Sequence, residues 1–239
     1  MSSTAYPPSV AYPLSVRGFF DQPSRALWLV KWLLLIPHYI ILVFLWLAFW
    51  IVTVIAFFAI LFTTRYPKGL FDFNVGVIRW SWRVSFYGYA ALGTDKYPPF
   101  TLADVPDYPA RLDLEYPQQL NRWLPLVKWL LAVPQYILVG ALVGSGYVIS
   151  ISVQENSVIS YSTPSLIGAC IAIAAIAMLF TTRYPPGLYD FAVGINRWGY
   201  RLLVYVALKT DQYPPLRLDQ GSIDGEVPAQ PPEPSVPGQ

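Results

Sequence analysis

The sequence predicts a membrane α-helical fold with minor β structure, in which two tandem repeats each form a transmembrane helical hairpin followed by an interfacial amphipathic helix. The chain is 55% hydrophobic and only 13% charged, about half the charged share of a soluble domain. No Asp, Glu, Lys or Arg occurs between Lys31 and Arg65, and this run exceeds the roughly 20 apolar residues that span a bilayer core. Long motifs of the first half also recur in the second half.

Two matched blocks of sequence define the repeats. The block Val30–Leu34 recurs as Val127–Leu131 at an offset of 97, and Phe62–Pro67 recurs as Phe180–Pro185 at an offset of 118. The second repeat therefore carries an insertion of 21 residues between its blocks, with a polar part at Gln154–Ser157. Because unpaired polar backbone is not tolerated in hydrocarbon, we expect the insertion in a loop outside the membrane.

The repeats and the composition of the ends divide the chain into four parts. We expect a disordered N-terminus over residues 1–11, a first membrane repeat over 12–104, a second membrane repeat over 105–219 and a disordered tail over 220–239. The tail is rich in Pro, Gly, Gln and acidic residues and shows no apolar period, which is typical of disorder.

The apolar part of the first repeat admits two topologies. In one, it is a hairpin of two short spans that turns near Trp46–Trp50; in the other, Pro37 ends an interfacial helix and one span runs over His38–Thr64. Trp prefers the headgroup level, which only the hairpin provides at its turn. The hairpin also keeps the matching basic motifs of both repeats in one compartment. In the second repeat, we expect two apolar helices at about 124–151 and 165–182.

A shared motif ends each apolar block and precedes a further helix. A cation stabilises the C-terminus of a helix, and proline moves the residue before it out of the helical conformation. The next helix is predicted over about residues 69–92 in the first repeat and 187–208 in the second. The residues of the helix-end motif are Arg65, Tyr66, Pro67, Arg183, Tyr184 and Pro185.

Each of these later helices carries one acid and two arginines at positions i, i+7 and i+11, which lie on one helix face. A charged stripe beside a broad apolar surface predicts a helix in the membrane interface. The arginines could bind anionic lipid headgroups, or they could pair with the acids and hold each helix to its own repeat. The candidate residues are Asp72, Arg79, Arg83, Asp190, Arg197 and Arg201.

Alternation of apolar and polar residues flanks each repeat and predicts short strands. We expect these strands to lie on one side of the membrane and to pair into a small extramembrane sheet that joins the two halves. The predicted segments are Leu14–Arg17, Phe100–Leu102, Arg111–Glu115 and Leu216–Asp219.

The chain offers few groups for catalysis. His38 is the only histidine and its counterpart in the second repeat is Gln135, so we expect a hydrogen-bonding role. A single cysteine, Cys170, excludes an intramolecular disulfide and a cysteine-based metal cage. We therefore predict no catalytic residue, no metal and no cofactor. The net charge of +2 is too small to indicate nucleic acid as a partner.

The motifs Arg-Tyr-Pro-x-Gly-Leu-(Phe/Tyr)-Asp-Phe, Arg-Trp-x-x-Arg and Thr-Asp-x-Tyr-Pro-Pro together resemble the bacterial, often actinobacterial, membrane family catalogued as domain of unknown function 4389. The resemblance covers about residues 12–104 and 108–219 and implies the bacterial plasma membrane, without an established activity. The hairpins predicted for the two repeats give four spans, so we expect a multi-pass protein.

These observations together predict a non-enzymatic accessory or scaffold protein whose partners are membrane lipids. Other membrane proteins, or a second copy that packs through Gly140 and Gly144, are further expected partners. The alternative function is a small transporter or a lipid-handling protein, because tandem repeats commonly frame a site at the membrane midplane.

Overall fold

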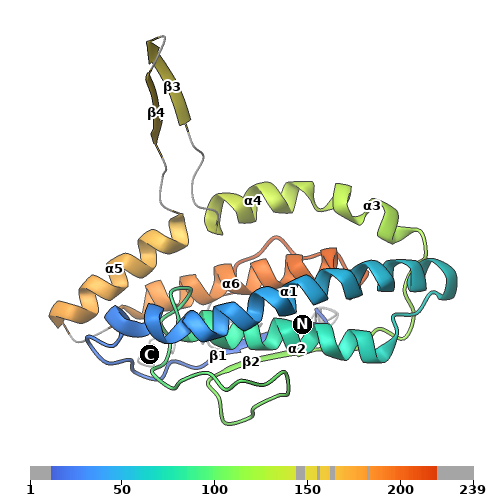
Figure 1. Ribbon diagram of the computed structural model, residues 1–239, viewed down its shortest axis with the longest axis horizontal. Coiled ribbons are helices and arrows are strands. Elements are labelled where there is room, and N and C mark those ends of the chain that lie inside the picture. The colour runs from blue at the N-terminus through green and yellow to red at the C-terminus, as the bar shows by residue number, and fades with distance from the viewer. Residues whose placement is uncertain (1–11, 144–148, 155–156, 162–164, 182–183, 220–239) are drawn as a thin grey trace, which may run out of the picture.

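The computed structural model describes residues 12–143, 149–154, 157–161, 165–181 and 184–219, and it is mostly helical, as predicted (Figure 1). The predicted disordered ends, residues 1–11 and 220–239, lie outside the described residues. In chain order, the elements are β1 (Leu14–Gly18), α1 (Trp28–Thr63), α2 (Lys68–Tyr87), β2 (Ala110–Leu114), α3 (Leu124–Leu131), α4 (Val133–Val143), β3 (Ile149–Gln154), β4 (Ser157–Tyr161), α5 (Leu166–Thr181) and α6 (Pro186–Val206).

Helix α1 is a single helix of 36 residues that is apolar on nearly every side. Only 22% of its most apolar stretch is buried. The buried side chains follow one another mostly at intervals of three or four residues, so they form one stripe, which packs against α2. These buried residues are Lys31, Leu35, His38, Leu42, Phe49, Thr53, Ala56 and Ile60.

The hairpin predicted for the first repeat is wrong, because α1 runs through Trp46–Trp50 without a turn. Pro37 does not end the helix either. The prediction relied on the preference of Trp for the headgroup level. The indole N–H of Trp46 instead donates to Ser81 Oγ at 3.0 Å, so protein satisfies this polar group. The helix ends at Thr63, and the next residue, Thr64, has a left-handed φ of 59°, directly before the predicted helix-end motif.

In the second repeat, α3 and α4 match the first half of α1, and α5 matches its second half. Helices α3 and α4 meet at a bend of 45°. Strands β3 and β4 pair with each other and project from the body between α4 and α5 (Figure 1). We call α1 of the first repeat, and α3, α4 and α5 of the second, the outer helices. The insertion therefore interrupts the outer helix of the second repeat near the position that corresponds to the middle of α1. Gly144 and the rest of 144–148 lie outside the described residues.

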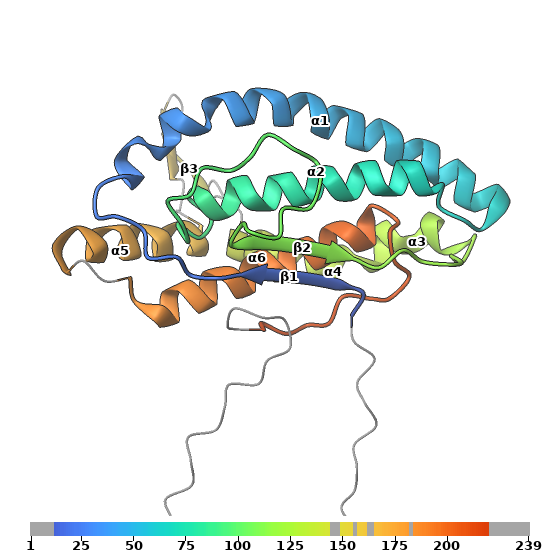
Figure 2. The same cartoon turned by 90° about the horizontal axis from the view of Figure 1, so that it is seen from below.

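Helices α2 and α6 form the predicted third helix of each repeat, although α2 ends earlier than predicted. Their apolar sides are buried in the core, including Phe71, Val75, Ile78 and Trp82 of α2. Among the described residues, no exposed large hydrophobic side chain belongs to α2 or α6. Figure 2 shows α1 arching over α2, with β1 and β2 beyond α2 on the other side.

The two strands β1 and β2 come from different repeats and pair antiparallel, with Val16 opposite Leu112. This pairing confirms a small sheet that joins the halves. The other two predicted strands, Phe100–Leu102 and Leu216–Asp219, are not strands. Their segments instead bind arginine side chains from the third helices through backbone carbonyls, which uses the groups that a strand ladder would need.

Candidate functional site

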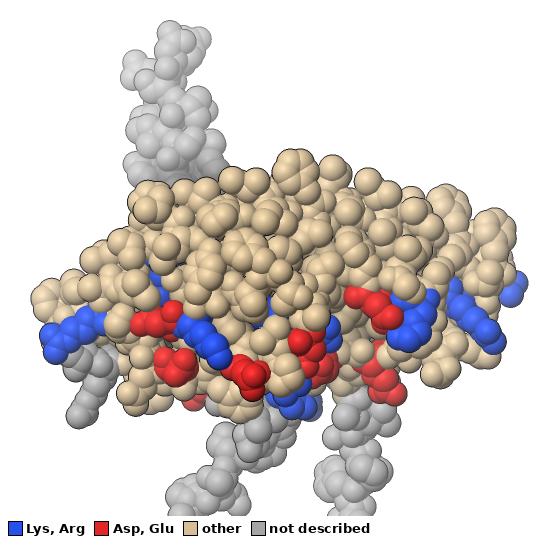
Figure 3. Space-filling view, turned by 60° about the horizontal axis from the view of Figure 1, so that its bottom comes forward, with Lys and Arg blue, Asp and Glu red and all other residues tan. Residues whose placement is uncertain are grey.

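One face of the protein carries large apolar side chains and, among the described residues, no charged side chain. The exposed side chains that form it belong to α1, α3, α4 and α5, and they include Phe44 at 67%, Phe62 at 76% and Phe180 at 80% exposure. Figure 3 shows this surface in its upper part, with the charged residues gathered in a band below it. We call the exposed apolar side chains of these four helices the apolar face. Exposed patches of this kind indicate a binding surface.

The outer helices lie along the protein rather than end-on to it. At 1.5 Å per residue, α1 is about 54 Å long, whereas the hydrocarbon core of a bilayer is about 30 Å thick. Figure 2 shows that the middle of α1 is the part farthest from β1 and β2, while both its ends bend back toward them. By length and composition, α1 could cross a membrane, and α3 with α4 would make a second crossing if the bent pair counts as one.

A buried lysine near the start of each outer helix fixes that helix to its own repeat. Lys31 Nζ lies 3.0 Å from Asp95 Oδ1, and Lys128 Nζ lies 2.7 Å from Asp211 Oδ1. Each ammonium also donates to the carbonyl of the threonine before that aspartate, at 2.7 and 2.8 Å. Removing one partner of a buried pair leaves an uncompensated charge. Both lysine clamps therefore hold the outer helices to the loops after α2 and α6.

A second matched contact lies one to two turns further along. The indole N–H of Trp80 donates to His38 Nδ1 at 3.1 Å, and the indole N–H of Trp198 donates to Gln135 Oε1 at 2.6 Å. His38 and Gln135 are both fully buried. The hydrogen-bonding role predicted for His38 is confirmed, and glutamine replaces histidine because both offer an acceptor to the indole.

Two of the predicted arginines donate hydrogen bonds to backbone carbonyls of the strands that join the repeats. Arg79 Nε donates to the carbonyl of Leu112 at 2.9 Å, and Arg197 Nε donates to the carbonyl of Val16 at 2.9 Å. A two-stranded ribbon leaves unpaired backbone groups at its edges. Each arginine satisfies one of these carbonyls on the strand that the other repeat contributes.

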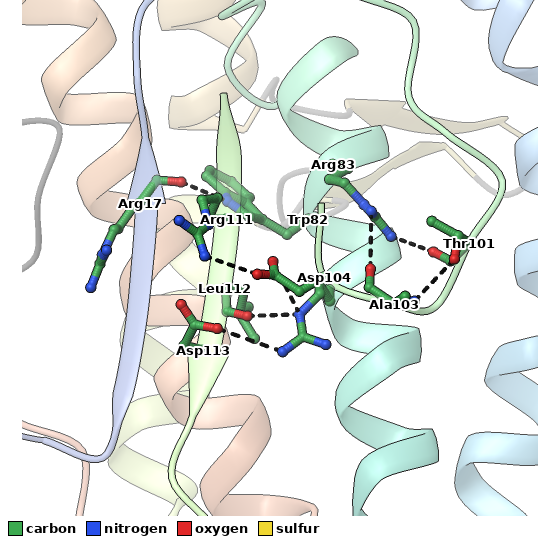
Figure 4. A network of polar contacts seen from close by, with 10 residues as sticks. Arg17, Trp82, Arg83, Thr101, Ala103, Asp104, Arg111, Leu112 and Asp113 are labelled. Atoms are coloured by element: carbon green, nitrogen blue, oxygen red, sulfur yellow. Dashed lines mark hydrogen bonds and ion pairs between the residues drawn. The ribbon is translucent and has the colours of Figure 1, made fainter. Parts of the chain in front are cut away.

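The second arginine of each third helix binds the segment that follows it in its own repeat. Arg83 donates to the carbonyls of Thr101 and Ala103 (Figure 4), and Arg201 contacts Asp219. Burial, more than the nearby charge of Arg79, lowers the pKa of Arg83 to about 10. The guanidinium therefore remains charged at neutral pH.

The acids of the predicted stripe have other surroundings. Asp72 pairs with Lys68 at 3.0 Å, and both side chains are exposed. Burial raises the pKa of Asp190, while the charge of Arg197 opposes that rise. Arg79 lies 3.6 Å from Asp113 and 4.0 Å from Asp104. Asp104 also pairs with Arg111 at 2.8 Å (Figure 4).

Burial separates the arginines that a lipid headgroup could reach from those that it could not. Arg83, Arg197 and Arg201 are at most 1% exposed, so their contacts lie inside the protein. Exposed arginines stand instead at the ends of the outer helices, and within the described residues they have no ion pair. These are Arg25, Arg65 and Arg122. Arg65 belongs to the predicted helix-end motif and follows an apolar block, whereas Arg25 and Arg122 precede apolar blocks.

The helix-end motif meets an aromatic cage at the boundary of the repeats. The ammonium of Lys209 lies 4.5, 5.0 and 5.6 Å from the ring centres of Tyr66, Phe71 and Phe49, and it donates to Tyr66 Oη at 3.2 Å. Lys209 is fully buried, and no carboxylate pairs with it among the described residues.

In the second repeat, the tyrosine of the helix-end motif contacts an uncharged group. The hydroxyl of Tyr184, which matches Tyr66, donates to the carbonyl of Ala91 at 3.0 Å. The position that matches Lys209 is Gly93, where an added Cβ would come within 2.3 Å of the Phe86 ring. A buried lysine therefore occurs at the contact of Tyr66 and not at the matching contact of Tyr184. Arg183, the cation of this motif, lies outside the described residues.

The described residues include no group of three or more His, Cys, Asp or Glu side chains that could hold a metal ion.

A family model described as "Domain of unknown function (DUF4389)" matches residues 25–101 and 157–216, more than half of the chain. The two matched segments are consistent with a duplicated domain. They cover less than the resemblance suggested, because α3 and α4 of the second repeat fall outside them. Searches of curated proteins and of solved structures found no match.

Proposed function

The chain belongs to the DUF4389 family, and we propose that it is a non-enzymatic membrane protein that lies in one leaflet of a bilayer. The apolar face would contact acyl chains, and the charged layer of α2, α6, β1 and β2 would face water. The observation that carries this proposal is the exposure of so many large apolar side chains on a surface that, within the described ranges, has no charged side chain.

The lysine clamps favour a helix that enters and leaves on one side over a helix that crosses. Lys31 ties the start of α1 to Asp95, and Tyr66, just after its end, contacts Lys209. Both contacts belong to the layer below the apolar face. This arrangement keeps the basic motifs of both repeats in one compartment without any crossing. It replaces the multi-pass placement expected from composition.

The exposed arginines Arg25, Arg65 and Arg122 would then lie at the headgroup level and bind anionic lipids. Each basic residue near an anionic surface contributes about 1 kcal/mol. Such a protein suits an accessory or scaffold role at the bacterial plasma membrane, where its lower layer would meet other proteins. A transporter for polar solutes would need ionisable groups at membrane depth, but His38 and Lys128 are engaged by the protein itself.

Labelling of introduced cysteines tests the placement. In a Cys170→Ala background, Ser24→Cys precedes α1 and Lys68→Cys follows it. A membrane-impermeant maleimide applied to sealed vesicles should modify both cysteines from the same side. Modification of the two from opposite sides would show that α1 crosses the bilayer and would overturn the one-leaflet proposal.

A further inference from the structure

A cavity of about 470 Å³ opens between the two repeats, within the size range of ligand sites in proteins. We call it the inter-repeat cavity. The cavity is lined by side chains of α1, α2 and α6, namely Tyr39, Leu42, Val43, Trp46, Ser81, Val84, Ser85 and Tyr200. Val43 is 66% exposed and belongs to the apolar face, so the cavity opens on that face.

One polar group of the cavity is satisfied by the protein itself. Ser81 Oγ accepts from the Trp46 indole at 3.0 Å and donates to the carbonyl of Val77 at 2.9 Å. The hydroxyls of Tyr39, Ser85 and Tyr200 also lie in the lining. No charged side chain lines the cavity. The rest of the lining is aromatic and aliphatic, which indicates an uncharged hydrocarbon chain as the ligand.

The cavity depends on a small residue that the other repeat does not share. The position of Ser85 is matched on α6 by Leu203, which is half-buried and packs against the hydrophobic core. The second repeat therefore folds with a large apolar side chain at the position that matches Ser85. The space beside Ser85 is not required by the fold, which favours a role in binding.

We infer that the inter-repeat cavity binds one acyl chain of a membrane lipid. The inference rests on the proposed function, because lipid reaches the opening only if the apolar face lies in the bilayer. It makes the protein a lipid-binding scaffold in which one chain of a bound glycerolipid lies between α1 and α2.

Photolabelling can separate cavity binding from membrane contact. The full chain is reconstituted into phosphatidylcholine vesicles that contain a trace of phosphatidylcholine with a diazirine in one acyl chain. Phe44 on the apolar face reports contact with the bilayer. Ser81 and Val84 are only 7% and 1% exposed, so labelling of α2 over residues 81–85 reports a chain inside the cavity. We expect both regions to be labelled.

Matched variants test the assignment. Ser85→Leu introduces the residue found at the equivalent position of α6 and should abolish labelling of α2 while labelling at Phe44 stays. Ser85→Ala keeps the space open and should label as the wild type does. Val43→Trp narrows the opening from an exposed position that folding does not need, and it should also abolish labelling of α2.

Two results would overturn these ideas separately. Equal labelling of α2 in Ser85→Ala, Ser85→Leu and Val43→Trp, or no labelling of α2 in the wild type, would refute the acyl-chain site and leave the membrane placement standing. Absence of labelling at Phe44 in the wild type would refute the membrane placement itself.

Discussion

Lys209→Met should stabilise the protein near neutral pH and remove part of the pH dependence of its stability. Burial lowers the pKa of Lys209 from 10.5 to about 7. Between these values the unfolded chain binds a proton that the folded protein does not, so the free energy of unfolding rises with pH across this window. Methionine has a similar length and fills irregular apolar sites.

The size of the effect follows from two opposing contributions. Each unit of pKa difference corresponds to 1.36 kcal/mol, so a lowering from 10.5 to about 7 makes the charged form cost about 5 kcal/mol in the folded protein at pH 7. Attraction between the ammonium and the rings of Tyr66, Phe71 and Phe49 offsets about 2 kcal/mol of this cost. Desolvation therefore wins, and the variant should gain about 3 kcal/mol at pH 7.

Chemical unfolding in mild detergent, followed by tryptophan fluorescence from pH 6 to pH 11, measures the difference between variant and wild type. The difference should be largest at pH 6, below the folded-state pKa of about 7, should fall as the pH rises, and should vanish near pH 11, where the unfolded lysine also loses its proton. Lys96→Met, at an exposed lysine, serves as the control and should show no such trend. A difference that is constant with pH would refute the reasoning, because it would mean that the cage accommodates the charged lysine at no cost.

Three further predictions concern the apolar face, the lysine clamps and the exposed arginines. Phe44→Asp should weaken binding to phosphatidylcholine vesicles, measured by flotation, by about 3 kcal/mol, the cost of a charge at membrane depth. The control Gln118→Asp, in an exposed loop, should float as the wild type does. Equal flotation of the two variants would contradict the membrane placement. Asp211→Asn should lower the free energy of unfolding by about 3 kcal/mol because Lys128 keeps a buried charge, and adding Lys128→Met should recover part of the loss in the same unfolding assay. Combined Arg25→Gln, Arg65→Gln and Arg122→Gln should reduce the preference for vesicles with anionic lipid by about 3 kcal/mol, on the basis of about 1 kcal/mol per cation, and an unchanged preference would show that these arginines do not bind headgroups.

The sequence predicted the elements of the fold better than their contacts. The third helix of each repeat followed from the helix-end motif and from the apolar side of the helix, which includes Phe71 and Trp82 in α2. The strands β1 and β2 followed from period-two alternation. The predicted turn at Trp46–Trp50 failed because Ser81, on a different helix, satisfies the indole of Trp46. A hydrogen bond between two helices leaves no pattern in the local sequence. The composition of the segment alone therefore favoured a turn that places Trp46 at the membrane interface.

The arginines illustrate the same limit. Their spacing correctly places them on one face of α2 and α6, but spacing cannot distinguish a face toward headgroups from a face toward carbonyls of another segment. Arg79 and Arg197 bind the strands of the opposite repeat, and Arg83 binds the loop after its own helix. Segments such as Phe100–Leu102 alternate as a strand does, yet they are held by side chains rather than by a partner strand.

The two repeats differ most at the middle of the outer helix, and the positions of the anchors explain why. In the first repeat this helix is continuous; in the second it is interrupted between Val143 and Leu166. The matched anchors, Lys31 with Asp95 and Lys128 with Asp211, lie near the start of the helices, and the contacts of Tyr66 and Tyr184 lie at their ends. An insertion at the middle removes none of these contacts. The lower layer can therefore keep the same arrangement in both repeats while the upper layer diverges, and the inter-repeat cavity lies on the side where the outer helix remained whole.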